Sequence, residues 1–203
     1  MPSPPNLPRG YLPRLAADFY RGDAVVFWTH AVKDRGRGWL DDNFHRVFRE
    51  LMLHAAVREQ LLCPSYALMP DHLHLVWMGV AAESDQRRAT AFLRPRLEVA
   101  LAPHRLQHQA FDHVLRPWER RRKAFAAVCD YISDNPVRAG LTARPDEWPY
   151  TGCIVAGYPD LNPLAADFWE IFWRIYDAKV SLVTSAATAT LGSRSSVFRG
   201  SRR

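Results

Sequence analysis

The chain has 203 residues, 48% of them hydrophobic and 12% aromatic, which suits one domain with a sizeable core. Its formal net charge is +6, and because only three of the 27 basic residues are lysine, 24 (27 − 3) are arginine. The arginine guanidinium binds phosphates through two hydrogen bonds and stacks on bases, so the arginine excess is consistent with a nucleic-acid partner. Genomic base composition alone can also produce an excess of arginine over lysine. Three cysteines without a Cys-x-x-Cys pair argue against a disulfide framework and indicate reduced thiols.

The first residues, MPSPPNLPRGYLPR, carry prolines and arginines where a signal peptide needs an apolar run. No stretch approaches the roughly 18 consecutive apolar residues of a membrane-spanning helix. We therefore expect a cytoplasmic protein without a membrane partner.

Hydrophobic periodicity predicts strands and helices along the chain. The expected elements, in order, are a strand at 24–32, a helix at 41–60 with an Asp cap, strands at 65–69 and 72–78 around a Pro-Asp turn, a helix at 83–101 kinked or split by Pro95, a weaker strand at 111–115, a helix at 117–134, and a helix at 164–178. This order predicts an α+β domain, an antiparallel sheet covered by helices.

Composition divides the chain into four segments. These are a flexible basic, proline-rich arm at 1–20, the domain at 21–155, a helical extension at 156–182, and a disordered basic tail at 183–203.

Two histidines, His72 and His74, stand one residue apart within the strand 72–78. Residues i and i+2 of a strand lie on one face, about 7 Å apart, so both imidazoles project together with Val76. The alternate residues, which are apolar, line the opposite face and are expected to pack on helices. Neutral imidazole is a common metal donor, so the pair can converge on one cation. The alternative is a pair of solvated histidines hydrogen-bonded to their neighbours.

A second candidate group lies in DYISDNPVRAGL, residues 130–141. Tyr131 and Asn135 are four residues apart, which on a helix places their β-carbons roughly 5–6 Å apart on one side. Asn135 offers a neutral oxygen to a metal, and Tyr131 offers a phenol that can act as a nucleophile. The alternative is a half-buried core tyrosine and an asparagine that ends a helix before proline.

Together, PDHLHLVW and the later DYISDNPVRAGL resemble the REP-associated tyrosine transposases, in the single-tyrosine branch of the HUH (His-hydrophobic-His) nucleases. FWTHAVKDR, FDHVLR and EWPY are similar to further segments of that family, so the likeness spans about residues 20–155. It implies a ferredoxin-like antiparallel sheet of four to five strands covered by helices. Residues 83–110 and those after 155 do not match, and Phe111 stands where the family often has an aromatic pair.

The resemblance also implies the chemistry. His72 and His74 would be metal ligands, Asn135 the third ligand, where many insertion-sequence relatives carry Gln, and Tyr131 the nucleophile. The ligand types alone suit Mn, Mg, Co or Zn, and the resemblance favours Mg or Mn. The implied activity is metal-dependent nicking and strand transfer of single-stranded hairpin DNA through a 5′-phosphotyrosine, for DNA transposition, by a monomer or a homodimer.

The expected helix at 117–134 contains Tyr131 and is called the tyrosine helix below. Basic residues around it are the predicted DNA contacts. ERRRK, residues 119–123, precedes Tyr131 by about two turns and indicates a phosphate grip, the alternative being a solvated helix face. The predicted contacts are Arg116, Arg120, Arg121, Arg122, Lys123 and Arg138.

Two other functions compete with this interpretation. A hairpin-DNA-binding regulator without turnover would tolerate loss of Tyr131 or the histidines, yet all are present. A zinc-dependent small-molecule hydrolase built on the histidines would leave Tyr131 and the arginines unexplained.

Overall fold

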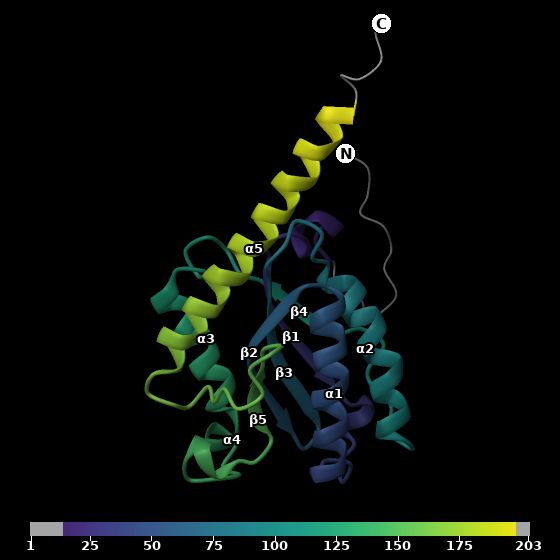
Figure 1. Cartoon of the computed structure of the whole chain (residues 1–203). Coiled ribbons are helices and arrows are strands. Elements are labelled where there is room, and N and C mark those ends of the chain that lie inside the picture. The colour runs from purple at the N-terminus through teal and green to yellow at the C-terminus, as the bar shows by residue number, and fades with distance from the viewer. Residues whose placement is uncertain (1–13, 198–203) are drawn as a thin grey trace, which may run out of the picture.

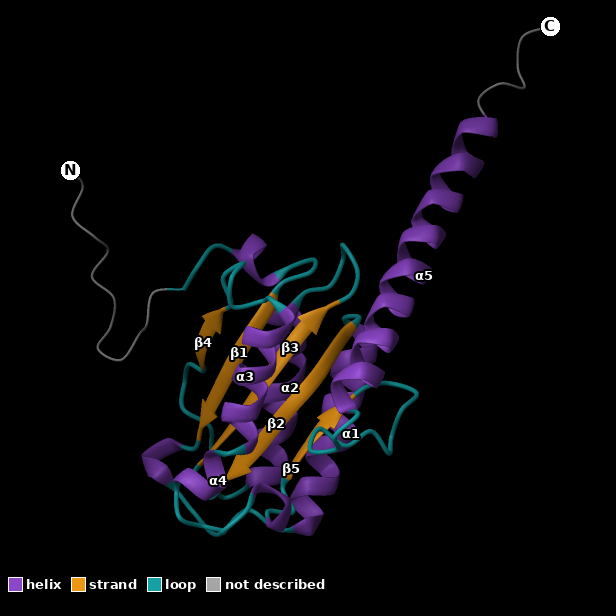
Figure 2. Ribbon diagram, turned by 90° about the vertical axis from the view of Figure 1, so that its left-hand side faces the viewer, coloured by secondary structure: helices purple, strands orange, loops and turns teal. Residues whose placement is uncertain are grey.

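The computed structural model describes residues 14–197, and side chains as far as residue 185. Within this range one sheet of five antiparallel strands runs in the order β4-β1-β3-β2-β5 (Figure 2). The strands are β1 (Val25–Ala31), β2 (Leu61–Met69), β3 (His72–Gly79), β4 (Phe111–Val114) and β5 (Thr151–Ile154). The antiparallel α+β prediction is thus confirmed. The short β5 was not expected as an element of its own.

The helices follow the predicted order closely. They are α1 (Asp42–Arg58), α2 (Gln86–Leu101), α3 (Arg122–Ser133), α4 (Asn135–Arg138) and α5 (Phe168–Val197), with short 3₁₀ turns η1 (Ala17–Tyr20), η2 (Lys33–Arg35) and η3 (Pro145–Glu147). The succession β1-α1-β2-β3-α2-β4, with strand order β4-β1-β3-β2, is the ferredoxin-like arrangement, and β5 extends it beyond β2. No described helix is long and apolar enough to cross a bilayer.

Helices cover both faces of the sheet (Figure 1). On one face α1 and α2 pack over a core that includes Trp28, Leu73 and Trp77. On the other, α3 and α5 pack over a second core that includes Val76 and Phe125. The expectation that the helices pack on the face opposite the histidine pair is therefore too narrow. The histidine face is covered too, because residues of β1, β2 and β3 on that side are apolar as well.

The chain ends differ from the predicted arm and tail. Residues 1–13 and 198–203 lie outside the described range. Within it, Tyr20 is fully buried and its hydroxyl donates to Asp112, so the last part of the arm belongs to the fold. Helix α5 continues through residues 183–197, which were expected to be disordered. That stretch is dominated by small residues and contains no proline, so a helix already anchored by its packed first half can propagate through it.

Helices α2 and α3 also differ in detail from the expectation. Pro95 does not split α2, whose residues Leu93 and Leu97 are buried on either side of it. Since Pro95 itself is exposed, its ring faces away from the core. Helix α3 begins at Arg122, not at 117, because the preceding residues form turns in which Glu119 accepts a hydrogen bond from the backbone of Arg116.

Candidate functional site

The histidine pair lies at the start of β3, the central strand of the sheet. The Nε2 atoms of His72 and His74 are 3.0 Å apart and point at each other, with the rings at 79°. His74 is buried, at 9% exposure, whereas His72 is partly open to solvent. The strand period predicted a shared face, and the structure brings the two ring nitrogens together.

The Nδ1 atoms of His72 and His74 each contact a neighbouring side chain that fixes the orientation of the ring. The Asp71 carboxylate lies 2.6 Å from Nδ1 of His72, where it can accept a hydrogen bond from that nitrogen and orient Nε2 outward. Nδ1 of His74 lies 2.9 Å from the hydroxyl of Thr29, its cross-strand partner on β1, and Phe27 stacks on the ring at 5.3 Å. This arrangement is typical of imidazoles that present Nε2 to a metal.

Electrostatics favour the ligating form of the site. Burial, followed by the charge of His72, lowers the pKa of His74 to about 3, so the ring is neutral at physiological pH. For Asp71, burial acts to raise the pKa, but the hydrogen bond from His72 and the charges of His72, Arg35 and Arg37 outweigh it and lower the pKa. Arg35 also forms a 3.3 Å ion pair with that carboxylate. The orienting group is therefore an anion.

The two imidazoles do not complete a protein-only metal site. Among residues 14–185, no group of three or more His, Cys, Asp or Glu side chains is placed to hold a metal. A further ligand must then be an amide, a hydroxyl, water or a substrate oxygen. Two neutral nitrogens with open positions fit a cation that also binds phosphate oxygens.

Helix α3 lies on the same face of the sheet as the histidine pair. Its last turn is joined to β2 through Ser65, whose hydroxyl donates to the Cys129 carbonyl and lies 3.3 Å from Ser133 Oγ. Ser65 is paired with Val76, which shares a strand face with His74. Helix α4 contacts β2 and lies at the end of the sheet where β2 stops and β3 begins (Figure 2). The C-terminal end of the tyrosine helix is therefore the end nearest the histidines.

The sequence suggested that Tyr131 and Asn135 share one helix. In the structure they do not, because α3 ends at Ser133 and Asn135 begins α4. They are still adjacent, since the Asn135 amide nitrogen donates to the carbonyls of Tyr131 and Ile132 at 2.8 and 3.3 Å. The amide oxygen faces away from those carbonyls. Tyr131 is 45% exposed and carries the Arg138 guanidinium over its ring at 4.9 Å. Within the described residues, no hydrogen bond or ring contact joins either residue to the histidines.

The remaining predicted DNA contacts lie around the other end of α3. Arg120 and Arg122 form ion pairs with Asp23 at 2.6 Å and Asp177 at 3.2 Å, and Arg122 also lies over a tryptophan ring of α5. Arg121 and Lys123 are exposed to solvent. Two of the six are thus engaged in ion pairs within the protein.

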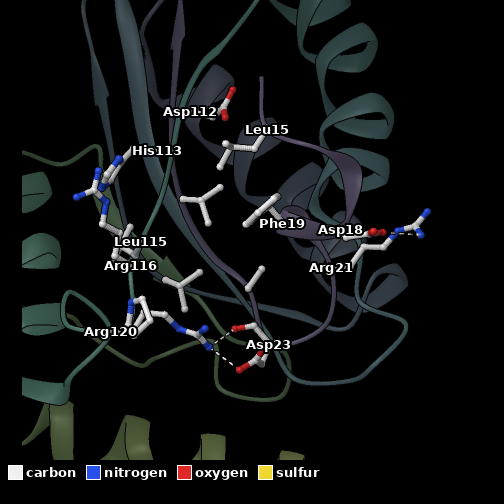
Figure 3. A pocket seen from close by; sticks show the side chains of 14 residues that line it. Leu15, Asp18, Phe19, Arg21, Asp23, Asp112, His113, Leu115, Arg116 and Arg120 are labelled. Atoms are coloured by element: carbon white, nitrogen blue, oxygen red, sulfur yellow. Dashed lines mark hydrogen bonds and ion pairs between the residues drawn. The ribbon is translucent and has the colours of Figure 1, made fainter. Parts of the chain in front are cut away.

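Arg116 and Arg120 line a cavity of about 570 Å³ between residues 15–25 and β4, where Figure 3 draws the Arg120–Asp23 contacts. This cavity contains the first residue of β1, and the last residue of that strand pairs with His72. The two places are therefore roughly 20 Å apart along the strand. Arg138 alone among the predicted contacts stands beside Tyr131.

The sequence interpretation gave no role to Asp71, Thr29 and Phe27. Asp71 directly precedes His72, so a carboxylate next to the histidine pair was a usable signal. Thr29 and Phe27 come from β1, and only the pairing of β1 with β3 brings them to His74.

The structure thus combines a ferredoxin-like sheet, a His-x-His pair on its central strand and, on the same face, the helix that carries Tyr131. The chain is similar to REP-associated tyrosine transposases in sequence and in fold, as its two motifs indicated. A Haemophilus influenzae protein with that curated name is 25% identical over 148 residues, covering 66% of this chain and 81% of that protein. A solved structure of the REP-associated tyrosine transposase bound to a REP hairpin matches with a TM-score of 0.58 and 19% identity, over 70% of this chain and 81% of that one. No family model matches the chain.

Proposed function

We propose that this protein is a metal-dependent transposase that nicks and rejoins single-stranded DNA through a 5′-phosphotyrosine on Tyr131. The observation that carries the proposal is the convergence of His72 and His74, whose Nε2 atoms stand 3.0 Å apart while Asp71 orients one ring. Two imidazoles presented in this way, on the face that carries the tyrosine helix, suit a cation that holds a scissile phosphate.

His72 and His74 would hold the cation, Mg²⁺ or Mn²⁺, and the oxygen of Asn135 would be the third ligand. When bound, such a cation polarises the phosphate and offsets the charge that develops on its oxygens. Asp71 and Thr29 keep the two imidazoles oriented throughout.

The reacting group is the phenol of Tyr131. Its oxygen, after losing the proton, attacks phosphorus and forms a phosphotyrosine bond, while the bond to the sugar oxygen breaks and a 3′-hydroxyl leaves. Bond energy is conserved in this exchange, so the strand can be rejoined elsewhere without ATP. The half-exposed position of Tyr131 on the protein surface leaves the phenol accessible to a DNA strand.

The proposed substrate is hairpin DNA with an unpaired foot, which exposes both a phosphate and its bases. The structure of the similar transposase contains a REP hairpin, which supports this choice. Arg121, Lys123 and Arg138 are exposed on the side of α3 and α4, and they can contact backbone phosphates without breaking an ion pair inside the protein. We place the enzyme in the bacterial cytoplasm, acting as a monomer or a homodimer.

One observation favours a second candidate, a hairpin-binding regulator without turnover. Tyr131 makes no contact with the histidine pair among the described residues, so attack requires the DNA to bridge the two. A regulator would bind hairpins equally well with Tyr131 replaced by phenylalanine and would never form a covalent adduct.

Trapping the intermediate decides between the two. Wild-type protein, incubated with Mg²⁺ or Mn²⁺ and a labelled hairpin oligonucleotide, should retain label after denaturation, and peptide mapping should place it on Tyr131. Tyr131→Phe removes one oxygen from an exposed ring, so folding and hairpin binding should persist while cleavage and the adduct disappear. Label on another residue, or cleavage without any adduct, would refute Tyr131 as the nucleophile.

A further inference from the structure

A strongly basic pocket lies between η1 and the first half of α2, on the α1/α2 side of the sheet. Its volume is about 480 Å³. Five arginines line it against one carboxylate, that of Asp85, and the arginines are Arg14, Arg21, Arg87, Arg88 and Arg94. The histidine pair lies on the other face, under α3, so nothing in the proposed cleavage chemistry accounts for this concentration of charge.

Two of these arginines shape the wall of the pocket. Arg94 donates to the carbonyls of Gln107 and His108 and to Nδ1 of His30, the last at 3.1 Å. Arg14 donates to the carbonyl of Ala110 at 3.2 Å and pairs with Asp112 at 3.2 Å. Arg94 therefore holds the segment before β4 against α2, and Arg14 ties the residues before η1 to Ala110 and to β4.

The other three arginines surround the N-terminal turn of α2. Arg87 and Arg88 occupy the first turn of the helix, where the helix dipole disfavours cations. Asp85 offsets part of that cost, because its side chain accepts from both backbone nitrogens at 3.0 Å and pairs with Arg21 at 3.1 Å. Arg21 also forms an ion pair with Asp18 at 3.7 Å, a contact that Figure 3 draws.

Arg87 differs from its neighbours in its partners. Arg88 pairs with Glu59 at 3.3 Å, whereas Arg87 lies over the ring of Tyr20 at 5.9 Å and forms no ion pair among residues 14–185. An exposed guanidinium held over an aromatic ring keeps its planar fork available for a bidentate anion.

A buried hydroxyl points to the same ligand. Thr90 lines the pocket, is 5% exposed, and its Oγ1 has no hydrogen-bond partner within the described part of the chain. It lies three residues after Arg87 on α2, so the two side chains share one side of the helix. A buried hydroxyl without a partner destabilises a fold, and an anionic oxygen in the pocket would accept a hydrogen bond from it.

We infer that this pocket binds a phosphoryl group, with Arg87 and Thr90 as the direct contacts. The phosphoryl group belongs either to a DNA backbone or to a free phosphate compound, and the chemistry of recognition is the same for both. The site is independent of the proposed cleavage at Tyr131. It lies under α2, and its occupancy requires neither the histidine pair nor a covalent step.

Two probes and three variants of the full chain test the inference. Pyrophosphate at fixed ionic strength represents the free compound, and a blunt-ended DNA duplex, which has no unpaired foot to cleave, represents the backbone. The variants are Arg87→Ala, Thr90→Val, and Arg96→Ala as a matched control, since Arg96 is exposed on the same helix but does not line the pocket.

Arg87→Ala and Thr90→Val should weaken binding of at least one probe roughly tenfold, and Arg96→Ala by less than about twofold. Without anion, Thr90→Val should melt at the wild-type temperature or above it, because it removes an unpartnered hydroxyl. An effect with pyrophosphate identifies a free phosphate ligand, and an effect with the duplex alone identifies the DNA backbone. If neither probe distinguishes these variants from Arg96→Ala, or if Thr90→Val lowers the melting temperature and leaves binding unchanged, the phosphoryl site is refuted. Cleavage at Tyr131 would be unaffected by that failure.

Discussion

The two faces of the sheet each bury a histidine, and burial lowers the pKa of both while their surroundings differ. His30 of β1 lies under α2, where burial followed by the charges of Arg94 and Arg14 lowers its pKa to about 3. His74 of β3 lies on the opposite face, where burial followed by the charge of His72 also lowers the pKa to about 3. A strongly lowered pKa therefore does not by itself mark a functional histidine.

What separates the two is where the second ring nitrogen points. Nε2 of His30 is buried without a hydrogen-bond partner in the described residues, and its Nδ1 meets only Arg94. Nε2 of His74 meets the Nε2 of a second imidazole, at the edge of solvent, with both Nδ1 atoms engaged by orienting groups. One histidine is a neutral core residue, and the other is half of a candidate ligand pair.

Alanine substitution should separate the two histidines most strongly. His72→Ala and His74→Ala should each lower hairpin cleavage by at least ~10³-fold, because a bound cation contributes several kcal/mol of charge stabilisation. Hairpin binding should change little, since arginines supply most of that affinity. Chelation of the metal by EDTA should reproduce the loss of cleavage in the wild type. The control variant His30→Leu should cleave at the wild-type rate under conditions in which it is folded. Full activity in EDTA would rule out the metal.

Acid should destabilise the fold through His30. The unfolded chain protonates this histidine near pH 6.5, whereas the folded protein keeps it neutral down to about pH 3. Its contribution to stability is therefore complete above pH 6.5 and is lost as the pH falls toward 3, amounting to on the order of a few kcal/mol. Urea unfolding from pH 7 to pH 4 should show a shallower loss in His30→Leu than in wild type. Equal slopes would contradict a buried, neutral His30.

Removing the orienting charge should have a smaller effect than removing a ligand. Asp71→Asn keeps the shape of the side chain but loses the anion that fixes the His72 proton, and it should lower metal affinity or cleavage roughly 10–100-fold. Titration with Mn²⁺ measures this directly, and excess metal should restore part of the rate. An unchanged metal dependence would limit Asp71 to a role in the β2–β3 turn.

Asn135→Ala tests the proposed third metal ligand, and we expect a smaller loss of cleavage than for Asp71→Asn. If its oxygen binds the cation, cleavage should fall by roughly tenfold or more, in the range found for groups that tune a metal site. The melting temperature serves as the control, because the side chain also joins α4 to the end of α3. A loss below tenfold would leave Asn135 with that structural role alone.

Salt dependence gives the finest comparison of the two faces. Arg121→Ala and Lys123→Ala on α3 should each reduce the slope of log affinity against log salt for single-stranded DNA by about 0.7. Arg96→Ala on α2 should leave the slope unchanged. A wild-type affinity that does not respond to salt would contradict DNA binding altogether.

Local sequence by itself determined much of this protein. The alternation of β3 puts His72 and His74 on one face in any sheet, since the period of a strand is two. The Asp41 cap starts α1 as predicted, its side chain accepting from the Phe44 backbone at 2.7 Å. These features depend on residues a few positions apart, and local geometry is the same in every fold.

Only the tertiary structure decided the partners of the site. The pairing of β1 with β3 brings Thr29 to His74, and the packing of α3 on β2 brings the end of the tyrosine helix to the histidine face. The position of α5 beside α3 pairs Arg122 with Asp177, a contact that the run of basic residues alone did not indicate. Strand register and helix placement follow from burying two apolar faces at once, and that depends on residues far apart in the chain.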